Sequence, residues 1–292
     1  MSKLALGTAQ FGLDYGINNR RGMIPEGEIA QILSYATVHG IDTLDTAAAY
    51  GDSEERIGRY QAGSGQKFKI VSKLPKDAGD PVAALTGSLA KLKANSLYGY
   101  LFHDFQTYEN NHGAWDKLVA LKAQGQIKKI GLSLYYPAEL EKTLADGLMF
   151  DLVQVPYNVF DRRFERYLPD LKKLGVEVHV RSIFLQGLFF REVATLSHYF
   201  DRIKNKLTRL REIAGREKSS LLEVTLGFAL ANPLIDKVVI GVDNLSNLQE
   251  ILAAEDVAVQ AAGQTVDLSE LREDDEAIIL PFNWEKEKAS VS

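Results

Sequence analysis

The stretch LDTAAAYGDSEERIG, residues 44–58, joins the end of an apolar segment to the start of a helix. Asp45 stands where the apolar residues stop, and Tyr50 follows in a turn that contains Gly51. Ser53 and the two glutamates after it are typical of a helix N-terminus. The stretch therefore predicts a buried strand, a polar loop and a helix, with an acid and a phenol at the mouth of the strand.

The same order of strand and helix recurs along the chain. The predicted strands are 3–8, 41–45, 68–74, 97–103, 127–133, 152–158, 176–184 and 237–241. One predicted helix begins near residue 53, and the others cover 26–39, 81–95, 113–124, 137–146, 162–174, 201–215 and 220–231. This alternation without linkers predicts an α/β fold, a (β/α)8 TIM barrel in a single domain over 1–292, with a C-terminal tail from about residue 255. A doubly wound sheet is the alternative, but its GxGxxG turn is absent.

The composition excludes several classes of function. The chain has 292 residues, 46% of them hydrophobic, and a net charge of −5 without a basic block, so no nucleic-acid partner is expected. No apolar run approaches the roughly 18 residues that a membrane span needs, and the start does not resemble a signal peptide. The chain has no cysteine, which excludes disulfides and thiolate chemistry and favours a cytoplasmic location. The scattered histidines predict no metal site.

Polar side chains stand at the ends of three neighbouring predicted strands. Asp45 ends the second strand, Lys73 lies near the end of the third and His103 ends the fourth. Active sites of such barrels lie at the C-terminal ends of the strands, so these residues and Tyr50 should meet. Each alone has an ordinary explanation, as a turn cap, a solvent-exposed lysine, a core histidine or a rim aromatic.

Together, these four side chains favour acid–base chemistry. A lysine beside a carboxylate stays charged, and a charged lysine beside a phenol is expected to lower the pKa of that phenol from about 10. The phenol can then exchange a proton near neutral pH, and an imidazole can orient a carbonyl group. These are the groups needed to reduce C=O when a cofactor supplies hydride.

Five motifs resemble those of the aldo-keto reductase superfamily from Leu4 to about Ile251. They are LDTAAAYGDSE (44–54), VSKL (71–74), LFHD (101–104), GQIKKIGLS (125–133) and QVPYNVFDRR (154–163). The resemblance implies a barrel that binds NAD(P)H without a Rossmann fold. It also implies that Tyr50 is the general acid, that Asp45 and Lys73 tune it, and that His103 orients the carbonyl.

The resemblance further implies where the cofactor is held. Ser133 and Gln154 match positions that hold the nicotinamide carboxamide, and Arg181 stands where the family often has an aromatic residue against the nicotinamide ring. Arg181 can stack on that ring or reach the pyrophosphate, which the loop SIFLQGL (182–188) is expected to contact. The residues expected to bind the pyrophosphate and the adenosine end are Ser182, Phe184, Gly187, Gly241, Asp243, Asn247 and Glu250.

The family resemblance favours NADPH, with NADH possible. The segment IGVDNLSNLQE (240–250) contains no Lys or Arg to grip a 2′-phosphate, and Asp243 adds a negative charge. A narrow preference for NADPH is therefore expected, with Lys237 or Arg181 as the available compensating cations.

The leading functional hypothesis is NAD(P)H-dependent reduction of a small aldehyde or ketone. The alternatives are a non-catalytic nucleotide-binding regulatory subunit on the same fold and a metal-dependent barrel hydrolase or isomerase. Turnover of an aldehyde panel and metal analysis separate the three. The substrate and the oligomeric state stay open, and the expected pocket walls are Phe11, Tyr15 and Phe105, with Phe282 or Trp284 over the top.

Overall fold

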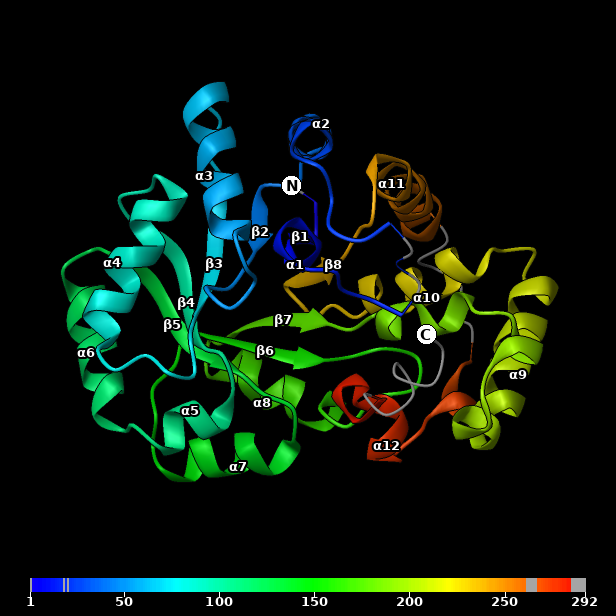
Figure 1. Cartoon of the computed structure of the whole chain (residues 1–292). Helices are drawn as coiled ribbons and strands as arrows, with labels where there is room; N and C mark the ends of the chain where they lie inside the picture. The colour runs from blue at the N-terminus through cyan, green and yellow to red at the C-terminus, as the bar shows by residue number, and fades with distance from the viewer. Residues whose placement is uncertain (1, 18, 20, 261–266, 285–292) are drawn as a thin grey trace.

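The computed structural model describes residues 2–17, 19, 21–260 and 267–284 (Figure 1). Its strands are β1 (Leu4–Gly7), β2 (Thr43–Asp45), β3 (Lys69–Leu74), β4 (Leu97–Phe102), β5 (Ile127–Ser133), β6 (Leu152–Pro156), β7 (Glu177–Arg181) and β8 (Lys237–Ile240). Each strand pairs in parallel with the next, and β8 pairs with β1 to close a barrel. The predicted (β/α)8 fold is therefore confirmed.

Helices surround the barrel, as Figure 1 shows. The longer ones are α2 (Glu26–Val38), α3 (Ser53–Ser64), α4 (Pro81–Leu92), α6 (Gly113–Ala123), α7 (Pro137–Ala145), α9 (Lys204–Arg216), α10 (Leu221–Leu230) and α11 (Leu245–Gln260). The shorter ones are α1 (Ala9–Gly12), α5 (Phe105–Glu109), α8 (Leu168–Lys173) and α12 (Glu276–Ile279). Short 3₁₀ turns are η1 (Glu165–Tyr167), η2 (Leu185–Phe190), η3 (Val193–Thr195), η4 (His198–Ile203), η5 (Ser269–Leu271) and η6 (Pro281–Trp284).

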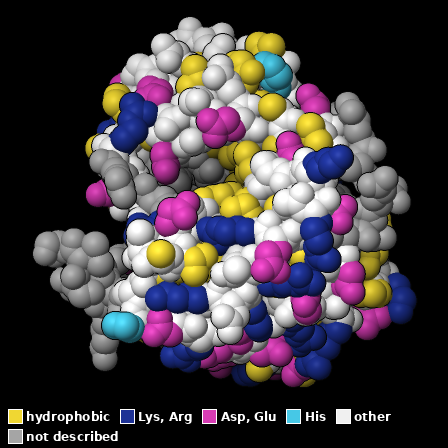
Figure 2. Space-filling model, turned by 90° about the vertical axis from the view of Figure 1, so that its right-hand side faces the viewer, with side chains coloured by type: hydrophobic (Ala, Val, Ile, Leu, Met, Phe, Trp, Pro, Cys, Tyr) yellow, Lys and Arg dark blue, Asp and Glu magenta, His cyan; other side chains and the backbone are white. Residues whose placement is uncertain are grey.

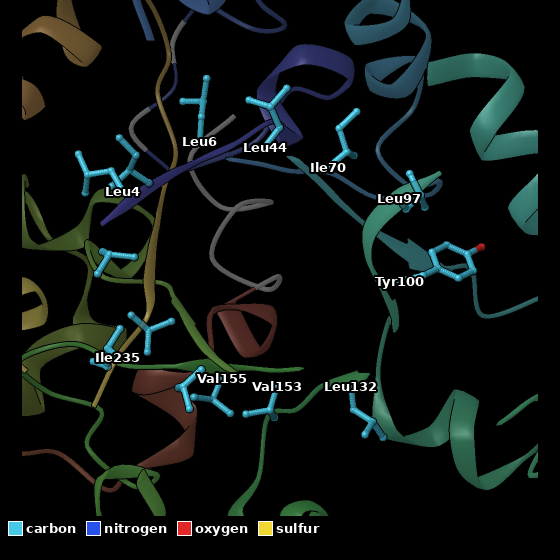
Figure 3. Close-up of a cluster of buried hydrophobic side chains, with 14 of the residues drawn as sticks. Leu4, Leu6, Leu44, Ile70, Leu97, Tyr100, Leu132, Val153, Val155 and Ile235 are labelled. Carbon is cyan, nitrogen blue, oxygen red and sulfur yellow. The ribbon is translucent and has the colours of Figure 1, made fainter. Parts of the chain in front are cut away.

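Strand residues that point outward form the main core against the helices. Leu4 and Leu6 of β1, Leu44 of β2 and Ile70 of β3 are buried there, together with Ile32 of α2 and others (Figure 3). Successive side chains of a strand point to opposite faces, so the residues between them point into the barrel. Because side chains alternate between the two faces, each short strand contributes residues both to the core under the helices and to the interior of the barrel.

The inside of the barrel has its own small apolar cluster. It consists of Val71 of β3, Leu101 of β4 and Leu152 of β6, all fully buried. Gly131 of β5 lets the backbone of β6 approach closely, because a Cβ on Gly131 would lie only 1.7 Å from the carbonyl oxygen of Leu152 and 3.2 Å from Leu101 Cδ2. This layer fills the barrel below its C-terminal end. The inward-pointing side chains two residues further along each strand lie directly above it.

Charged side chains fill the N-terminal end of the barrel. Glu177 of β7 lies 2.6 Å from Nε2 of the buried His179 and accepts a hydrogen bond of 2.8 Å from the Tyr98 hydroxyl. Lys237, at the start of β8, donates to Asp42 and to the Ser2 carbonyl. The prediction that Lys237 can reach the cofactor phosphate is therefore wrong, because it lies at the opposite end of the barrel from the C-terminal strand ends.

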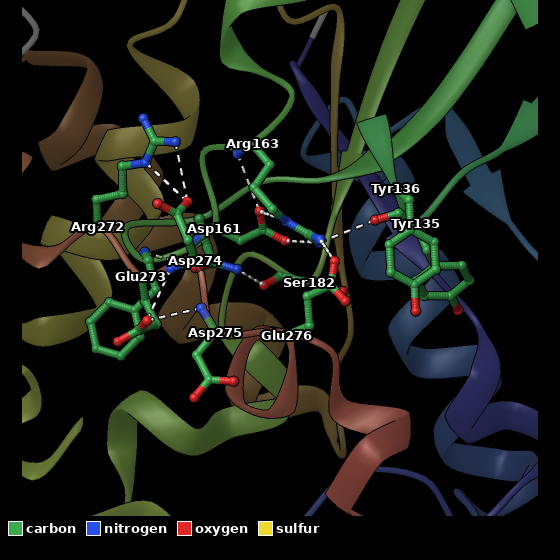
Figure 4. Close-up of polar contacts among 12 residues, drawn as sticks. Tyr135, Tyr136, Asp161, Arg163, Ser182, Arg272, Glu273, Asp274, Asp275 and Glu276 are labelled. Atoms are coloured by element: carbon green, nitrogen blue, oxygen red, sulfur yellow. Dashed lines mark hydrogen bonds and ion pairs between the residues drawn. The ribbon is translucent and has the colours of Figure 1, made fainter. Parts of the chain in front are cut away.

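The described part of the C-terminal segment packs against the loops at the barrel mouth. The indole of Trp284 is buried, donates to the carbonyl groups of Ala277 and Ile278, and meets Phe200 edge to face at 5.2 Å. Arg163, in the loop after β6, pairs with the buried Asp161 and also reaches Glu276 of α12 (Figure 4). These contacts fix the segment against the barrel.

The helices of the described residues do not include one that is long and apolar enough to cross a membrane. Across the same part of the chain, His, Asp and Glu side chains do not gather into a group of three that could hold a metal ion.

Candidate active site

A cavity of about 730 Å³ opens at the C-terminal ends of the strands. Figure 2 faces this end of the molecule and shows it hollowed, with hydrophobic side chains visible inside. All of the predicted site residues line this one cavity: Asp45, Tyr50, Lys73, His103, Ser133, Gln154, Arg181, Ser182, Phe184, Gly187, Gly241, Asp243, Asn247 and Glu250. The structure brings these residues together at one cavity, while their roles as site residues stay predictions.

Strand alternation brings the polar side chains into the barrel mouth. Lys73, His103 and Gln154 each follow, two residues later, a member of the inner apolar cluster formed by Val71, Leu101 and Leu152. Because the period of a strand is two residues, they point the same way as that cluster. The apolar layer therefore forms the floor of the polar site.

Lys73 and Asp45 form a buried ion pair. The Lys73 ammonium donates to Asp45 Oδ1 at 2.7 Å and to the Thr46 carbonyl at 3.0 Å. The second Asp45 oxygen accepts a hydrogen bond of 2.7 Å from Gln154 Nε2. Both charged side chains are almost fully buried, at 2% and 6% exposure. Such a pair is tolerated when further hydrogen bonds satisfy it, and Thr46 and Gln154 supply them here.

Tyr50 is positioned by a close contact between two backbone segments. Gly51 has a φ of +55°, and a Cβ there would lie 2.3 Å from the carbonyl oxygen of Gly12 in α1. A Cβ on Gly12 would lie 2.0 Å from the carbonyl oxygen of Tyr50. The two glycines thus let α1 press directly against the Tyr50 turn. Ser53, at the start of α3, ties the same turn to Thr8 through a hydrogen bond of 2.9 Å.

The Tyr50 ring lies beside the side chains of Lys73 and His103. The Lys73 ammonium is 5.3 Å from its centroid, and the His103 ring meets it edge to face at 5.9 Å. Burial raises the pKa of Tyr50, the Asp45 carboxylate adds to this, and Arg181 opposes it. The expectation that Lys73 lowers the pKa of this phenol is therefore wrong for this structure, because burial raises that pKa and the Asp45 carboxylate adds to the rise. Tyr50 is a protonated phenol at neutral pH.

His103 is a neutral imidazole at neutral pH. Burial lowers its pKa to about 4, with help from the positive charge of Lys73. Its buried Nδ1 has no hydrogen-bond partner among the described residues. A neutral imidazole whose ring lines the cavity can donate or accept one hydrogen bond toward a bound molecule.

The residues present fit a nicotinamide carboxamide. Gln154 Oε1 is buried and lacks a hydrogen-bond partner among the described residues, while the amide nitrogen of the same side chain donates to Asp45. Ser133, which pairs with Gln154 across β5 and β6, lines the cavity beside it. An unpaired acceptor next to a hydroxyl matches the donor and acceptor of a carboxamide. Buried polar atoms without partners are costly, so a ligand that satisfies Oε1 gains from it.

The loop after β7 is strained where it lines the cavity. Ser182, Leu185 and Gln186 all have positive φ, at 61°, 47° and 52°, and Gly187 follows at 87°. The Ser182 conformation ends β7 at Arg181, three residues before the predicted end of that strand at 184. Such backbone conformations in residues other than glycine cluster at functional sites. Asn158 holds the loop by donating to the Ser182 carbonyl and by capping its own turn.

Acidic groups dominate the far end of the cavity, around the start of α11. Asp243 is half-buried; burial raises its pKa, and Gln10 donates a hydrogen bond to it. Glu28 of α2 accepts a hydrogen bond from the Leu245 amide at the α11 N-terminus and forms an ion pair of 3.0 Å with Arg21. Arg21 lines the cavity with Asp243, Asn247 and Glu250. It is a cation that the sequence analysis missed, because it lies far from the 240–250 segment in the chain.

The predicted pocket walls are correct only in part. Tyr15 lines the cavity, and its hydroxyl accepts a hydrogen bond of 3.0 Å from Gln186. Phe11 and Trp284 are buried in cores instead, and Phe105 packs against the main core, so these three predictions are wrong. Phe282 does not line the cavity but packs edge to face on Tyr135 at 5.1 Å.

Tyr135 and Phe190 are cavity-lining aromatics that the sequence analysis did not name. Tyr135 follows β5, and its carbonyl accepts a hydrogen bond of 3.1 Å from Arg163 (Figure 4). The Arg181 guanidinium lies over the Tyr135 ring, 4.0 Å from its centroid. The signal for Tyr135 was its place two residues after Ser133, where β5 ends.

The fold and the site agree with the comparisons to known proteins. A model of the Aldo/keto reductase family matches residues 3–265, which is nearly the whole chain. The protein therefore belongs to the aldo/keto reductase family.

Relatives in this family are oxidoreductases. The chain is 25% identical over 281 residues to the uncharacterized oxidoreductase YqkF of Bacillus subtilis, covering 87% of this chain and 91% of that protein. It is 32% identical over 134 residues to the methylglyoxal reductase DkgA of Yersinia pestis, covering 44% and 47% of the two chains. The solved holo form of the aldo-keto reductase AKR11C1 from Bacillus halodurans has the same fold, with a TM-score of 0.73, 21% identity and 92% of each chain covered. The family and these relatives support an oxidoreductase.

Proposed function

We propose that this protein reduces an aldehyde or ketone to an alcohol with NAD(P)H, and that Tyr50 donates the proton. The observation that carries the proposal is the convergence of Tyr50, His103 and the Lys73–Asp45 pair at one end of the cavity, beside the unpaired oxygen of Gln154. A bound nicotinamide would supply hydride to the carbonyl carbon.

Tyr50 then acts as the general acid. Its raised pKa keeps the phenol protonated, so the proton is available whenever a carbonyl oxygen gains negative charge. An alkoxide is a stronger base than a phenolate, so the transfer runs downhill despite that raised pKa. The ammonium of Lys73, 5.3 Å from the ring centroid, offsets the Asp45 carboxylate, which would otherwise oppose the phenolate that remains.

His103 and Gln154 position the reacting groups. A neutral His103 can hold the carbonyl oxygen by a hydrogen bond without competing for the proton. Gln154 keeps the Asp45 carboxylate turned toward Lys73 by its hydrogen bond of 2.7 Å. Ser133 and Gln154 Oε1 would hold the carboxamide, and the strained loop of Ser182, Phe184 and Gly187 would face the pyrophosphate.

For the cofactor, we propose NADPH by a narrow margin, with NADH also accepted. Arg21 is a cation at the proposed ribose end and supports a 2′-phosphate, whereas Glu28 and Asp243 oppose one. Arg181 lies beside Leu134 and Tyr135, at the other end of the cavity, and does not serve this phosphate. Gly241 favours close approach of the nucleotide, because its face toward the cavity carries no side chain, and Asn247 and Glu250 offer polar contacts.

The proposed substrate is a small carbonyl compound, as the name of the methylglyoxal reductase relative suggests. Oxidation of NADPH and of NADH, followed by absorbance over a panel of aldehydes and ketones, tests the proposal. Nucleotide binding without turnover of any carbonyl would favour the regulatory alternative, and inhibition by a metal chelator would favour the metal-dependent one. The cytoplasmic location stays a prediction.

A further inference from the structure

Arg181 is a cation in the cavity wall that lacks a carboxylate partner. Lys73 pairs with Asp45 and Arg21 pairs with Glu28, but none of the described carboxylates forms an ion pair with Arg181. At the catalytic end of the cavity, Asp45 and Lys73 neutralise each other, and His103 and Tyr50 are uncharged at neutral pH. Glu139 accepts hydrogen bonds from the Tyr135 and Tyr136 amides and is near enough for its charge to act on Arg181, but it forms no ion pair with it. The charge of Arg181 is therefore only partly compensated by the described carboxylates.

The guanidinium is held in place by neutral groups. One nitrogen donates to the Leu134 carbonyl at 3.1 Å, another donates weakly to the Ser182 hydroxyl at 3.4 Å, and the plane lies 4.0 Å from the Tyr135 ring centroid. Arg163 in turn fixes the Tyr135 carbonyl at 3.1 Å. A guanidinium has five N–H groups, so donors remain for a bound anion.

The positive charge of Arg181 affects the pKa values of the titratable side chains around the proposed reaction centre. Burial raises the pKa of the Tyr15 phenol to about 12, and the positive charge of Arg181 opposes that shift. The same charge opposes the raised pKa of Tyr50 and adds to the lowered pKa of His103. Arg181 therefore lies close to the groups that would surround a carbonyl, and the Tyr15 hydroxyl, which already accepts from Gln186, can donate its own proton to an anion there.

We infer that the preferred substrate carries a carboxylate, which Arg181 binds while Tyr50 and His103 face the carbonyl oxygen. The inference rests on the proposed reductase function and adds the chemical class of the substrate. The same guanidinium can attract another anion, the cofactor pyrophosphate, so the test must separate the two.

Matched substrates separate charge from shape. Glyoxylate, succinic semialdehyde and terephthalaldehydic acid are each compared with their methyl esters, which keep the carbonyl and lose the charge. Wild type is expected to favour at least one acid over its ester by about tenfold or more in kcat/KM. Arg181→Gln should lose about 10- to 100-fold on that acid, mainly through KM. It should lose clearly less on the ester, where only its effect on Tyr50 and His103 is removed. Arg181→Lys, which keeps the charge but loses the planar fork, should recover part of the loss.

Two binding measurements complete the test. The dissociation constants of NADPH and NADH are measured for wild type, Arg181→Gln and Arg59→Met, a control in an exposed ion pair of α3. A loss of nucleotide affinity as large as the loss on the acid would assign Arg181 to the pyrophosphate and overturn the inference. Esters that react as well as their acids would also overturn it.

Binding of terephthalate to the nucleotide complex, measured by calorimetry, does not need turnover. Binding to wild type that Arg181→Gln weakens would support the anion site even if every carbonyl proved inert and the reductase proposal failed. Equal binding to both proteins, or no binding to either, would overturn the anion site whatever the reductase activity.

Discussion

The side chain of Gln154 donates a hydrogen bond of 2.7 Å to Asp45, on the carboxylate oxygen that Lys73 does not use. Gln154 thus has two roles in one side chain. Its nitrogen completes the buried Lys73–Asp45 pair, and its oxygen is left without a described partner inside the cavity. The tuning of the proposed acid and the binding of the proposed cofactor are therefore coupled through a single amide group.

Tyr50→Phe should remove most of the reductase activity and leave nucleotide affinity nearly unchanged. The substitution deletes the hydroxyl that donates the proton, and a general acid typically contributes about 100- to 10,000-fold in rate. Steady-state turnover and nucleotide dissociation constants check this expectation. More than about a tenth of wild-type turnover would remove Tyr50 from the acid role.

Lys73→Met should reduce turnover strongly and should also destabilise the fold. The variant leaves Asp45 buried at 6% side-chain exposure without its cation, and such a loss typically costs about 3–5 kcal/mol. The double variant Asp45→Asn, Lys73→Met removes both charges and should regain much of the stability, measured by urea unfolding, without regaining turnover. Full activity in the single variant would show that Lys73 takes no part in the reaction.

Stability should fall as the pH drops from about 6.5 toward 4, and His103 should be one cause. The unfolded chain takes up a proton on His103 near pH 6.5, whereas burial holds the pKa of the folded imidazole at about 4. The unfolded state therefore binds more protons in this window, and the stability contribution present above it is lost as the pH falls through it.

His103→Gln should flatten the slope of unfolding free energy against pH in that window. His198→Gln is the matched control, since that imidazole is fully exposed, at 101%. Urea unfolding at a series of pH values measures both. Identical slopes in wild type and His103→Gln would mean that His103 does not resist protonation in the folded state.

Arg21→Met should weaken NADPH binding by about tenfold or more and leave NADH binding nearly unchanged. Arg21 is the described cation at the ribose end, and a hydrogen bond to a charged group contributes about 1.5–3 kcal/mol. Fluorescence titration with both nucleotides measures the ratio of affinities. If NADPH and NADH weaken equally, Arg21 supports the loop rather than the phosphate, and a clear wild-type preference for NADH would refute the NADPH proposal.

Gly12→Ala should lower turnover by displacing the Tyr50 turn. An added Cβ would meet the Tyr50 carbonyl oxygen at 2.0 Å, so α1 and the turn must separate. Gly87→Ala in α4 is the control, because none of the described atoms outside its chain neighbours and the backbone of its own helix lies within 4 Å of the added Cβ. Alanine in an open helical position stabilises by about 0.5–1 kcal/mol. Unchanged kcat in Gly12→Ala would show that the contact does not set the position of Tyr50.

The barrel and the polar strand ends could be predicted from the sequence because both depend on local pattern. Apolar runs that end in Asp45, Lys73 and His103 identify strand ends directly. The environment of Tyr50 could not be predicted, because its pKa depends on burial and on Asp45 together. Arg21 and Tyr135 were missed for a similar reason: only the folded loops bring residue 21 next to Asp243, and residue 135 next to Arg181.

The predictions of the pocket walls were wrong for a different reason. Phe11 lies in the short helix α1 and Trp284 in the C-terminal segment, and in both places the sequence is the same whether the aromatic side chain packs in a core or lines a cavity. The indole N–H of Trp284 donates to the carbonyl groups of Ala277 and Ile278, and no sequence pattern predicts this contact.

The pairing of Leu4 in β1 with Val238 in β8 also has a consequence for how the chain is made. The first strand leaves the ribosome early, but its second neighbour is synthesised only near the other end of the chain. Until then the growing sheet has two open edges, at β1 and at the latest strand, and both expose unpaired backbone groups that can join another chain. A nascent chain halted before β8 should therefore be prone to aggregation. Pairing of β8 with β1 removes both open edges and with them the exposed backbone groups.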